Sequence, residues 1–168
     1  MSLGTLYIVN NSGGVIYTRA LSLVPKLSGN DHLRLGSTFV SLHTIAKQLA
    51  PVQSGGIQVV ESSAFSLHCL ETPTGLKFFV TAAPKSQQAP RPSAQIVSAF
   101  LKEAYRLYAD FALKNPFYER DMPIRAKLFD HYMDSYVIKE GLGLGGAEVA
   151  KLEAKPVTTG GPLFVGSS

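Results

Sequence analysis

The spacing of hydrophobic and polar positions changes several times along the chain, and it indicates strands first. Residues 3–9, LGTLYIV, and residues 14–19, GVIYTR, are rich in β-branched and aromatic side chains, and turn formers lie between them. Two such runs around a short turn are typical of a β-hairpin. Residues 19–32, which contain Pro25, carry no regular pattern and are expected to form an irregular connection.

Residues 33–50 have the period of a helix. Their apolar side chains recur at three- and four-residue spacing, which places them on one face. Pro51 follows and is expected to end this helix. The predicted buried face consists of Leu35, Phe39, Leu42, Ala46 and Leu49.

Three strand-like runs come next, at residues 56–61, 65–71 and 75–83. Short turns separate them, so an antiparallel meander is expected. Alternation places Leu76, Phe78 and Val80 on one face of the last run. In the middle run it places Phe65, Leu67 and Cys69 on one face and Ser66 and His68 on the other.

The second half of the chain predicts two helices that are separated by a proline-containing break. Ser93 is a suitable cap for a helix over residues 94–114, and Asn115 before Pro116 ends it. A second helix is expected to begin near Pro123, at a first helical position, and to reach about residue 140. The predicted buried faces consist of Ile96, Phe100, Ala104, Leu107 and Phe111, and of Leu128, Phe129, Tyr132, Met133 and Tyr136.

Glycine, proline and small residues dominate from Gly141 onward. The expectation is one domain over residues 1–140 and a flexible tail over residues 141–168. The predicted order is ββαβββαα, an α+β domain built on a five-stranded antiparallel sheet.

Composition narrows the class of protein. The 168 residues carry a net charge of +4 with a pI of about 9.2, and the basic residues are dispersed, so a nucleic-acid-binding stripe is not expected. A single cysteine, Cys69, excludes an intramolecular disulfide and fits a reducing compartment such as the cytosol. The N-terminal stretch lacks the features of a signal peptide, and no apolar run approaches the roughly 18 residues of a membrane span.

Candidate chemistry is sparse. The GLGLGG stretch follows a predicted helix instead of a strand, which argues against a phosphate-binding loop. The four histidines and Cys69 are not spaced as metal ligands, and His68 and Cys69 are expected on opposite faces of a strand. Glu119 and Asp121 are better explained as solvated charges or helix caps than as an acid–base pair. We therefore expect no catalytic, cofactor or metal site.

The break over residues 115–125 is the strongest candidate for function. Apolar side chains in a surface connection favour either a structural corner or a docking site, and composition leaves both interpretations open. With His43 and Lys47, on the side of the first helix expected to be exposed, the candidate partner-binding residues are Asn115, Pro116, Phe117, Tyr118, Met122, Pro123, Ile124 and Arg125.

The stretch ALKNPFYERDMPIRAKLFD resembles the C-terminal signature of the synbindin-type (sedlin-like, longin-like) small subunits of the TRAPP vesicle-tethering complex. LYIVNNSGGVIYTR is similar to that family's first hairpin, and FSLHCLETPTGLKFFVTAAP to its central meander. The likeness runs in the family's order over about residues 3–138. Two departures stand out: residues 19–32 leave no room for the PDZ-like insertion of animal members, and the tail matches nothing in the family.

The resemblance implies a longin-like (SNARE-like, profilin-like) fold with one helix on one face of the sheet and two on the other. It also implies a noncatalytic core subunit, without cofactors, of an assembly that tethers vesicles in ER-to-Golgi transport and exchanges nucleotide on a Rab GTPase. The implied partners are other TRAPP subunits, especially a second longin-like subunit, and the Rab GTPase. The implied location is cytoplasmic, peripheral on endoplasmic reticulum and cis-Golgi membranes through the complex. The alternatives are a longin-type adaptor or SNARE-like regulator outside TRAPP, a small enzyme with an unrecognised site, and a light-chain-like dimerisation module for a motor.

Overall fold

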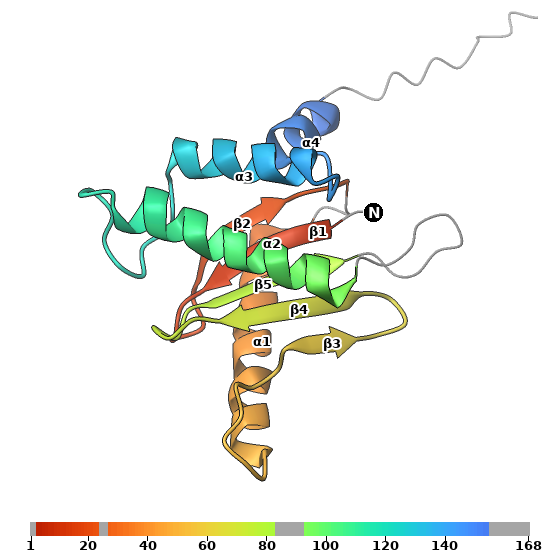
Figure 1. Ribbon diagram of the computed structural model, residues 1–168, viewed down its shortest axis with the longest axis vertical. Coiled ribbons are helices and arrows are strands. Elements are labelled where there is room, and N and C mark those ends of the chain that lie inside the picture. Colours follow the sequence, from red (N-terminus) through yellow and green to blue (C-terminus); the bar gives the residue numbers. More distant parts are fainter. Residues whose placement is uncertain (1–2, 24–26, 83–92, 155–168) are drawn as a thin grey trace, which may run out of the picture.

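A five-stranded antiparallel sheet forms the middle of the molecule in the computed structural model, which describes residues 3–23, 27–82 and 93–154 (Figure 1). The strands follow the order β2-β1-β5-β4-β3. They are β1 (Leu3–Val9), β2 (Val15–Ala20), β3 (Val59–Glu61), β4 (Ser66–Glu71) and β5 (Lys77–Ala82). The predicted hairpin and meander are confirmed, although β3 is shorter than the run of strand-forming residues that predicted it.

Helices cover both faces of the sheet. They are α1 (Gly29–Leu49), α2 (Ala94–Leu107), α3 (Lys127–Lys139) and α4 (Gly146–Glu153), with six residues of π-helix, η1 (Tyr108–Leu113), continuing α2. Helix α1 lies on one face, and α2 and α3 lie on the other (Figure 1). The α+β architecture, with one helix opposite two, agrees with the longin-like expectation. Within the described ranges no helix has both the length and the apolar character to cross a membrane.

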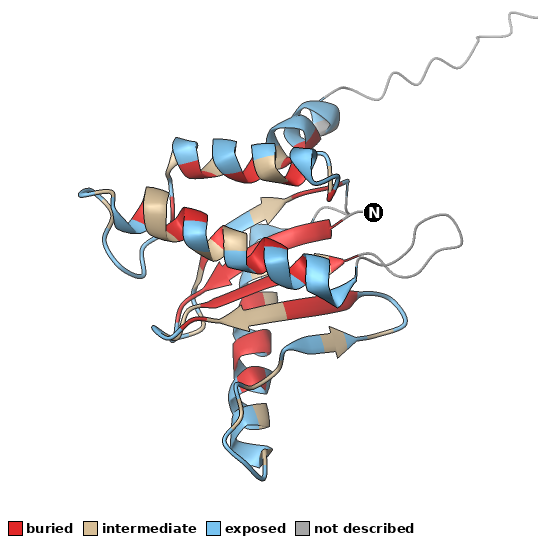
Figure 2. Cartoon of the chain, viewed as in Figure 1, coloured by how far each residue is buried: buried red, intermediate tan, exposed pale blue. Residues whose placement is uncertain are grey.

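Strand β1 shows how the two layers share the sheet. Leu6 and Ile8 point into the larger core beneath α2 and α3, whereas Tyr7 and Val9 belong to a smaller core beneath α1. All seven residues of β1 are buried, as expected for a central strand covered on both faces (Figure 2). Tyr7 stacks on Phe79 of β5 with ring centroids 4.7 Å apart, which continues the smaller core across the sheet.

Helix α1 begins earlier than predicted. Ser28 accepts a hydrogen bond from the N–H of Asp31, and the Asp31 carboxylate accepts from the N–H of Ser28, a reciprocal capping box. Residues 29–32 are therefore helical, and the expectation of an irregular connection there is wrong. The signal, Ser followed three residues later by an acidic residue, was present in the sequence.

The predicted buried face of α1 is also wrong in part. Leu42 and Leu49 are exposed, and the helix buries Phe39 together with Gly36, Val40 and His43. At Gly36 a Cβ would overlap the Val15 side chain, so this glycine lets α1 approach β2 closely. Because the helix lies this close to β2, the face that carries Gly36, Val40 and His43 meets the sheet. The neighbouring face, which carries Leu42 and Leu49, stays exposed.

Helix α2 follows the prediction at its ends. The Ser93 side chain accepts a hydrogen bond from the N–H of Ile96, as expected of a cap, and the helical segment stops before Pro116. Phe100, Ala104 and Leu107 of the predicted face are buried, whereas Ile96 is exposed, and Val97 and Leu101 are buried in addition. The switch to π-helical turns at Tyr108 was not predicted.

Helix α3 starts four residues later than the expected Pro123. The Ile124 N–H donates to the carbonyl of Ile16, 2.9 Å away, so this segment runs along the edge of β2 before the helix begins at Lys127. Helix α3 buries Phe129, Met133, Asp134 and Val137, while Leu128 and Tyr132, assigned to the core from their spacing, are exposed.

The segment after Gly141 differs most from the prediction. Residues 141–154 are not a loose tail: Leu142 and Val149 are buried, and the N–H groups of Leu144 and Gly145 donate to the carbonyl of Leu21. The Leu142 carbonyl accepts from the N–H of Leu3, so this segment closes the end of the sheet where β2 stops. Residues 155–168, the rest of the predicted tail, lie outside the described residues.

Candidate docking surfaces

The connection over residues 115–125 is held by a series of backbone turns. The Asn115 side-chain oxygen accepts from the N–H of Phe117, and the Asn115 carbonyl accepts from the N–H of Tyr118, each at 3.1 Å. Asp121 has a φ of 66°, a left-handed conformation that asparagine and aspartate tolerate better than most residues. The turns begin where η1 ends and finish where Ile124 joins the edge of β2. They give the connection a defined path.

This path exposes two large apolar side chains and buries others. Phe117 is 93% exposed and Met122 is 54% exposed. Ile124 is buried, and Tyr118 packs against the larger core with its ring edge-on to Tyr108. Tyr118 and Ile124 therefore anchor the connection as a structural corner, whereas Phe117 and Met122 face outward and remain candidates for a docking surface.

A hollow of about 430 Å³ opens within the connection. Tyr118 is one of the residues that line this hollow. Its hydroxyl is, among the described residues, the one buried side-chain polar atom without a hydrogen-bond partner. The hollow brings together most of the predicted site residues. Its lining includes Asn115, Phe117, Tyr118, Met122, Pro123, Ile124 and Arg125.

A second exposed apolar surface lies on the outer side of α1. Leu42, Ile45 and Leu49 follow one another at three- and four-residue spacing, and all three are exposed. Side chains at this spacing share one face of a helix. We call these three residues the α1 stripe.

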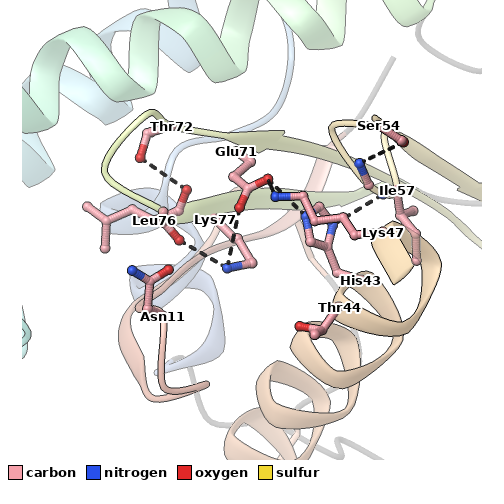
Figure 3. A network of polar contacts seen from close by, with 12 residues as sticks. Asn11, His43, Thr44, Lys47, Ser54, Ile57, Glu71, Thr72, Leu76 and Lys77 are labelled. Atoms are coloured by element: carbon pink, nitrogen blue, oxygen red, sulfur yellow. Dashed lines mark hydrogen bonds and ion pairs between the residues drawn. The ribbon is translucent and has the colours of Figure 1, made fainter. Parts of the chain in front are cut away.

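His43 does not lie on that exposed surface. Only 1% of the residue is accessible, because its ring lies between the sheet and the loop that follows α1, and the expectation of a surface or rim histidine is therefore wrong. Lys47, one turn further on, keeps 37% of its side chain exposed. His43 and Lys47 both point toward Glu71 of β4 (Figure 3).

Glu71 is the centre of a polar cluster. Its carboxylate lies 3.2 Å from His43 Nε2, 2.5 Å from Lys47 Nζ and 3.8 Å from Lys77 Nζ. The Lys77 ammonium also donates to the carbonyl of Gly75 at 3.0 Å. Burial alone would raise the pKa of Glu71, but the hydrogen bonds from Lys47 and His43 outweigh it and hold that pKa below its ordinary value.

The loop after α1 completes the cluster. The N–H of Ile57 donates to Nδ1 of His43 at 3.3 Å, which assigns the ring proton to Nε2, where it is donated to Glu71. Gly56 has a φ of +81°, and a Cβ there would overlap the His43 ring. The histidine therefore joins α1, the loop and β4 through contacts at both ring nitrogens.

Another hollow, of about 1030 Å³, lies beside β4 and the start of α2. His68 and Cys69 both line it, but they are neighbours on β4 and their side chains leave opposite faces of the sheet. Burial raises the pKa of Cys69 to about 12 and lowers that of His68, which disfavours thiolate chemistry. Within the described ranges, no three His, Cys, Asp or Glu side chains are grouped so that they could hold a metal ion.

The structure separates the predicted partner residues into two groups. The residues of the 115–125 connection share one hollow, with Pro116 exposed beside it, whereas His43 and Lys47 belong to α1 on the other face of the sheet. Sequence reasoning missed Glu71 and Lys77. These two are directly paired across β4 and β5, so the short turn between two predicted strands was a signal that could have identified them.

Comparison with known proteins supports one family. The model of the Sybindin-like family matches residues 3–140. A Dictyostelium discoideum protein named trafficking protein particle complex subunit 4 is 46% identical over 136 residues, which cover 80% of this chain and 95% of that protein. Proteins of the same name from Homo sapiens and Bos taurus are 46% identical over 107 residues, 63% of this chain. The matched part is 45% of the length of these animal relatives.

Among solved structures, a Roadblock/LC7 domain from Streptomyces avermitilis is similar at 15% identity with a TM-score of 0.47, covering 66% of this chain and 88% of that domain. This likeness is too distant to carry an argument about function.

Proposed function

The chain belongs to the Sybindin-like family, and from that premise we propose that it is a core subunit of the TRAPP complex that acts in vesicle trafficking. The observation that carries this proposal is the match to the Dictyostelium relative, because it spans 95% of a protein that bears the name of such a subunit. The other TRAPP subunits are accordingly its partners.

We propose further that the chain contributes to guanine-nucleotide exchange on a Rab GTPase without forming covalent bonds itself. Exchange requires only that contacts favour a GTPase conformation that holds nucleotide weakly, which is a population shift by differential affinity. The half-buried, high-pKa thiol of Cys69 and the structural role of His43 are compatible with a chain that acts through its surface. In this proposal the complex brings the chain to endoplasmic reticulum and cis-Golgi membranes, where it serves ER-to-Golgi transport.

Two surfaces are proposed for the partners. Phe117 and Met122 project from a connection whose turns fix their positions, so little conformational entropy is lost when a partner covers them. The α1 stripe offers an apolar helix face to a second longin-like subunit. The two surfaces lie on different faces of the sheet, so one chain can contact two neighbours in an assembly.

Co-purification tests the subunit assignment. The chain is co-expressed with the other TRAPP subunits of its own organism, and complex formation and the release of a fluorescent guanine nucleotide from candidate Rab GTPases are measured with and without it. We expect the chain to enter the complex and its omission to lower exchange. If the other subunits assemble without it while it pairs with unrelated trafficking proteins, an adaptor outside TRAPP becomes the correct assignment.

Point variants test the surfaces. Phe117→Ala and Met122→Ala should weaken assembly or exchange without changing stability. Leu152→Ala, an exposed apolar position on α4, is the matched control and should change neither. Equal behaviour of all three variants would show that the 115–125 connection is not a docking site.

A further inference from the structure

Helix α1 continues beyond the part that packs on the sheet. In Figure 1 its C-terminal turns run past the sheet on the side of β3. His43 is the last buried residue of the helix, and residues 44–49 are exposed or half-buried. The α1 stripe begins at Leu42 and lies largely on this projecting part. Contacts at the edge of the packed part, near His43, are therefore well placed to help fix the direction in which the stripe points.

Glu71 is placed to do this. It stands at the end of β4 and contacts α1 twice, at His43 and at Lys47, which are four residues apart and lie on the same helix face. Two contacts one turn apart fix both the position of the helix and its rotation about its own axis. Lys77, buried on β5, lies on the other side of the carboxylate and holds it toward the sheet.

The same cluster fixes the loop that returns from α1 to β3. The Ile57 N–H is bound by His43, and Gly56 packs directly on the imidazole ring. The Glu71 cluster, which we define as His43, Lys47, Glu71 and Lys77, thus joins the projecting turns, the returning loop and two strands. Three of its four members are at least four-fifths buried by side-chain exposure, and only Lys47 reaches solvent substantially.

We propose that Glu71 is a positioning residue: it sets the direction of the projecting half of α1 and thereby the affinity of the α1 stripe for the second longin-like subunit. This inference rests on the proposed function, since that subunit is the assigned occupant of the stripe. Leu42, Ile45 and Leu49 present an apolar ridge, the kind of helix surface that packs into the grooves of another helix. Helix–helix packing depends on the angle between the axes, so a shift in the direction of α1 weakens binding although no contacting side chain is changed.

The test is Glu71→Gln in the full chain. Glutamine has nearly the same shape and still offers an oxygen to His43, but it removes the charge that holds Lys47 and Lys77. Glu103→Gln is the matched control, because Glu103 pairs with Arg106 on the exposed side of α2, far from the cluster in sequence and on the other face of the sheet. Hydrogen exchange of residues 44–58 and the association and dissociation rates with the second longin-like subunit are measured for wild type and both variants.

We expect Glu71→Gln to speed exchange in residues 44–58 and to raise the dissociation constant roughly tenfold, the loss typical of one charge-assisted hydrogen bond. Most of the change should lie in the dissociation rate. In a double-mutant cycle with Lys47→Met, the effects of Lys47→Met and Glu71→Gln on affinity should be less than additive, because both changes remove the same Lys47–Glu71 contact.

The outcomes separate the two proposals. If wild type does not bind the second subunit at all, the proposed function is wrong and the inference falls with it. If wild type binds and Glu71→Gln binds equally well, the positioning role is overturned while the proposed function stands. If Glu71→Gln fails to fold, Lys47→Met keeps the length and apolar stem of Lys47 and removes one arm of the cluster. Unchanged exchange and affinity in that variant would likewise overturn the inference.

Discussion

Arg19 of β2 and Asp134 of α3 form a two-point ion pair that joins the edge of the sheet to the last helices. Arg19 Nε lies 2.8 Å from one carboxylate oxygen, and its NH2 nitrogen lies 2.5 Å from the other. The same carboxylate accepts the N–H groups of Gly146 and Ala147 at the start of α4. One aspartate therefore pairs with an arginine and caps a helix, as negative charge at a helix N-terminus favours.

Asp134→Ala should lower the free energy of unfolding by about 2–4 kcal/mol, because it removes the two-point partner of a mostly buried arginine and leaves a helix uncapped. Arg19 then keeps only its 3.3 Å contact with Asp130. Urea unfolding followed by circular dichroism measures the loss. Asp110→Asn is the control, since Asp110 makes only exposed pairs within its own helical segment, and it should have little effect. Equal losses in the two variants would contradict the role assigned to Asp134.

Stability should fall in acid, and Asp134 should contribute to the fall. Burial would raise the pKa of Asp134, but the hydrogen bonds from Arg19, Gly146 and Ala147 hold it below the ordinary value. The stabilisation is therefore complete above the unfolded-state pKa of about 3.9 and is lost as pH falls through the lower, folded-state pKa. Urea unfolding of wild type and Asp134→Asn from pH 7 to pH 3 should show a steeper loss for wild type. Parallel curves would refute the linkage.

Two glycine-to-alanine changes in α1 should have opposite results. Gly36→Ala places a methyl group against Val15 and should destabilise the protein by about 1–3 kcal/mol, the usual cost of overpacking. Gly29→Ala meets no atom within 4 Å and should be neutral or slightly stabilising, since alanine is the better helix former. Thermal unfolding of both variants decides the matter. A neutral Gly36→Ala would mean that α1 and β2 are not in close contact.

Two phenylalanines should separate stability from assembly. Phe129→Ala should lower the free energy of unfolding by about 3–5 kcal/mol, because the Phe129 side chain is fully buried. Phe117→Ala should leave the melting temperature unchanged. If Phe117→Ala lowers the melting temperature by several degrees, Phe117 is part of the fold in solution, and its assignment to a docking surface is wrong.

The Cys69 thiol should react slowly in the folded protein. Its pKa of about 12, raised by burial, leaves little thiolate at pH 8, and the thiolate is the reactive form. A chromogenic disulfide reagent should therefore label the native chain much more slowly than the chain in urea. Labelling at the same rate in both conditions would show that the strand around Cys69 opens readily.

The order of strands and helices followed from local pattern. The β-branched and aromatic run of β1, the alternation in β4 and β5, the turns between the strands, and the Ser93 and Pro116 boundaries all depend on neighbours in sequence. All of them appear in the structure. The family was likewise identified from the NPFYERDMPIR block and the hairpin, and the family model covers the same residues. The 115–125 connection was recognised as a surface feature by its composition, although its division into buried anchors and exposed tips was not.

The tertiary structure alone decided which stripe of each helix is buried. Helix α1 has several apolar stripes, and Gly36 against Val15 selected the one that contains His43 instead of the one that contains Leu49. The same holds for residues 141–154, whose composition resembles a loose chain but whose Leu142 finds a partner on β1, distant in sequence. The local sequence determines whether a segment has the hydrophobic period of a helix or of a strand. Which face of a helix is buried, and whether a weakly patterned segment is ordered, depend on contacts between residues that are distant in sequence and meet only in the folded protein.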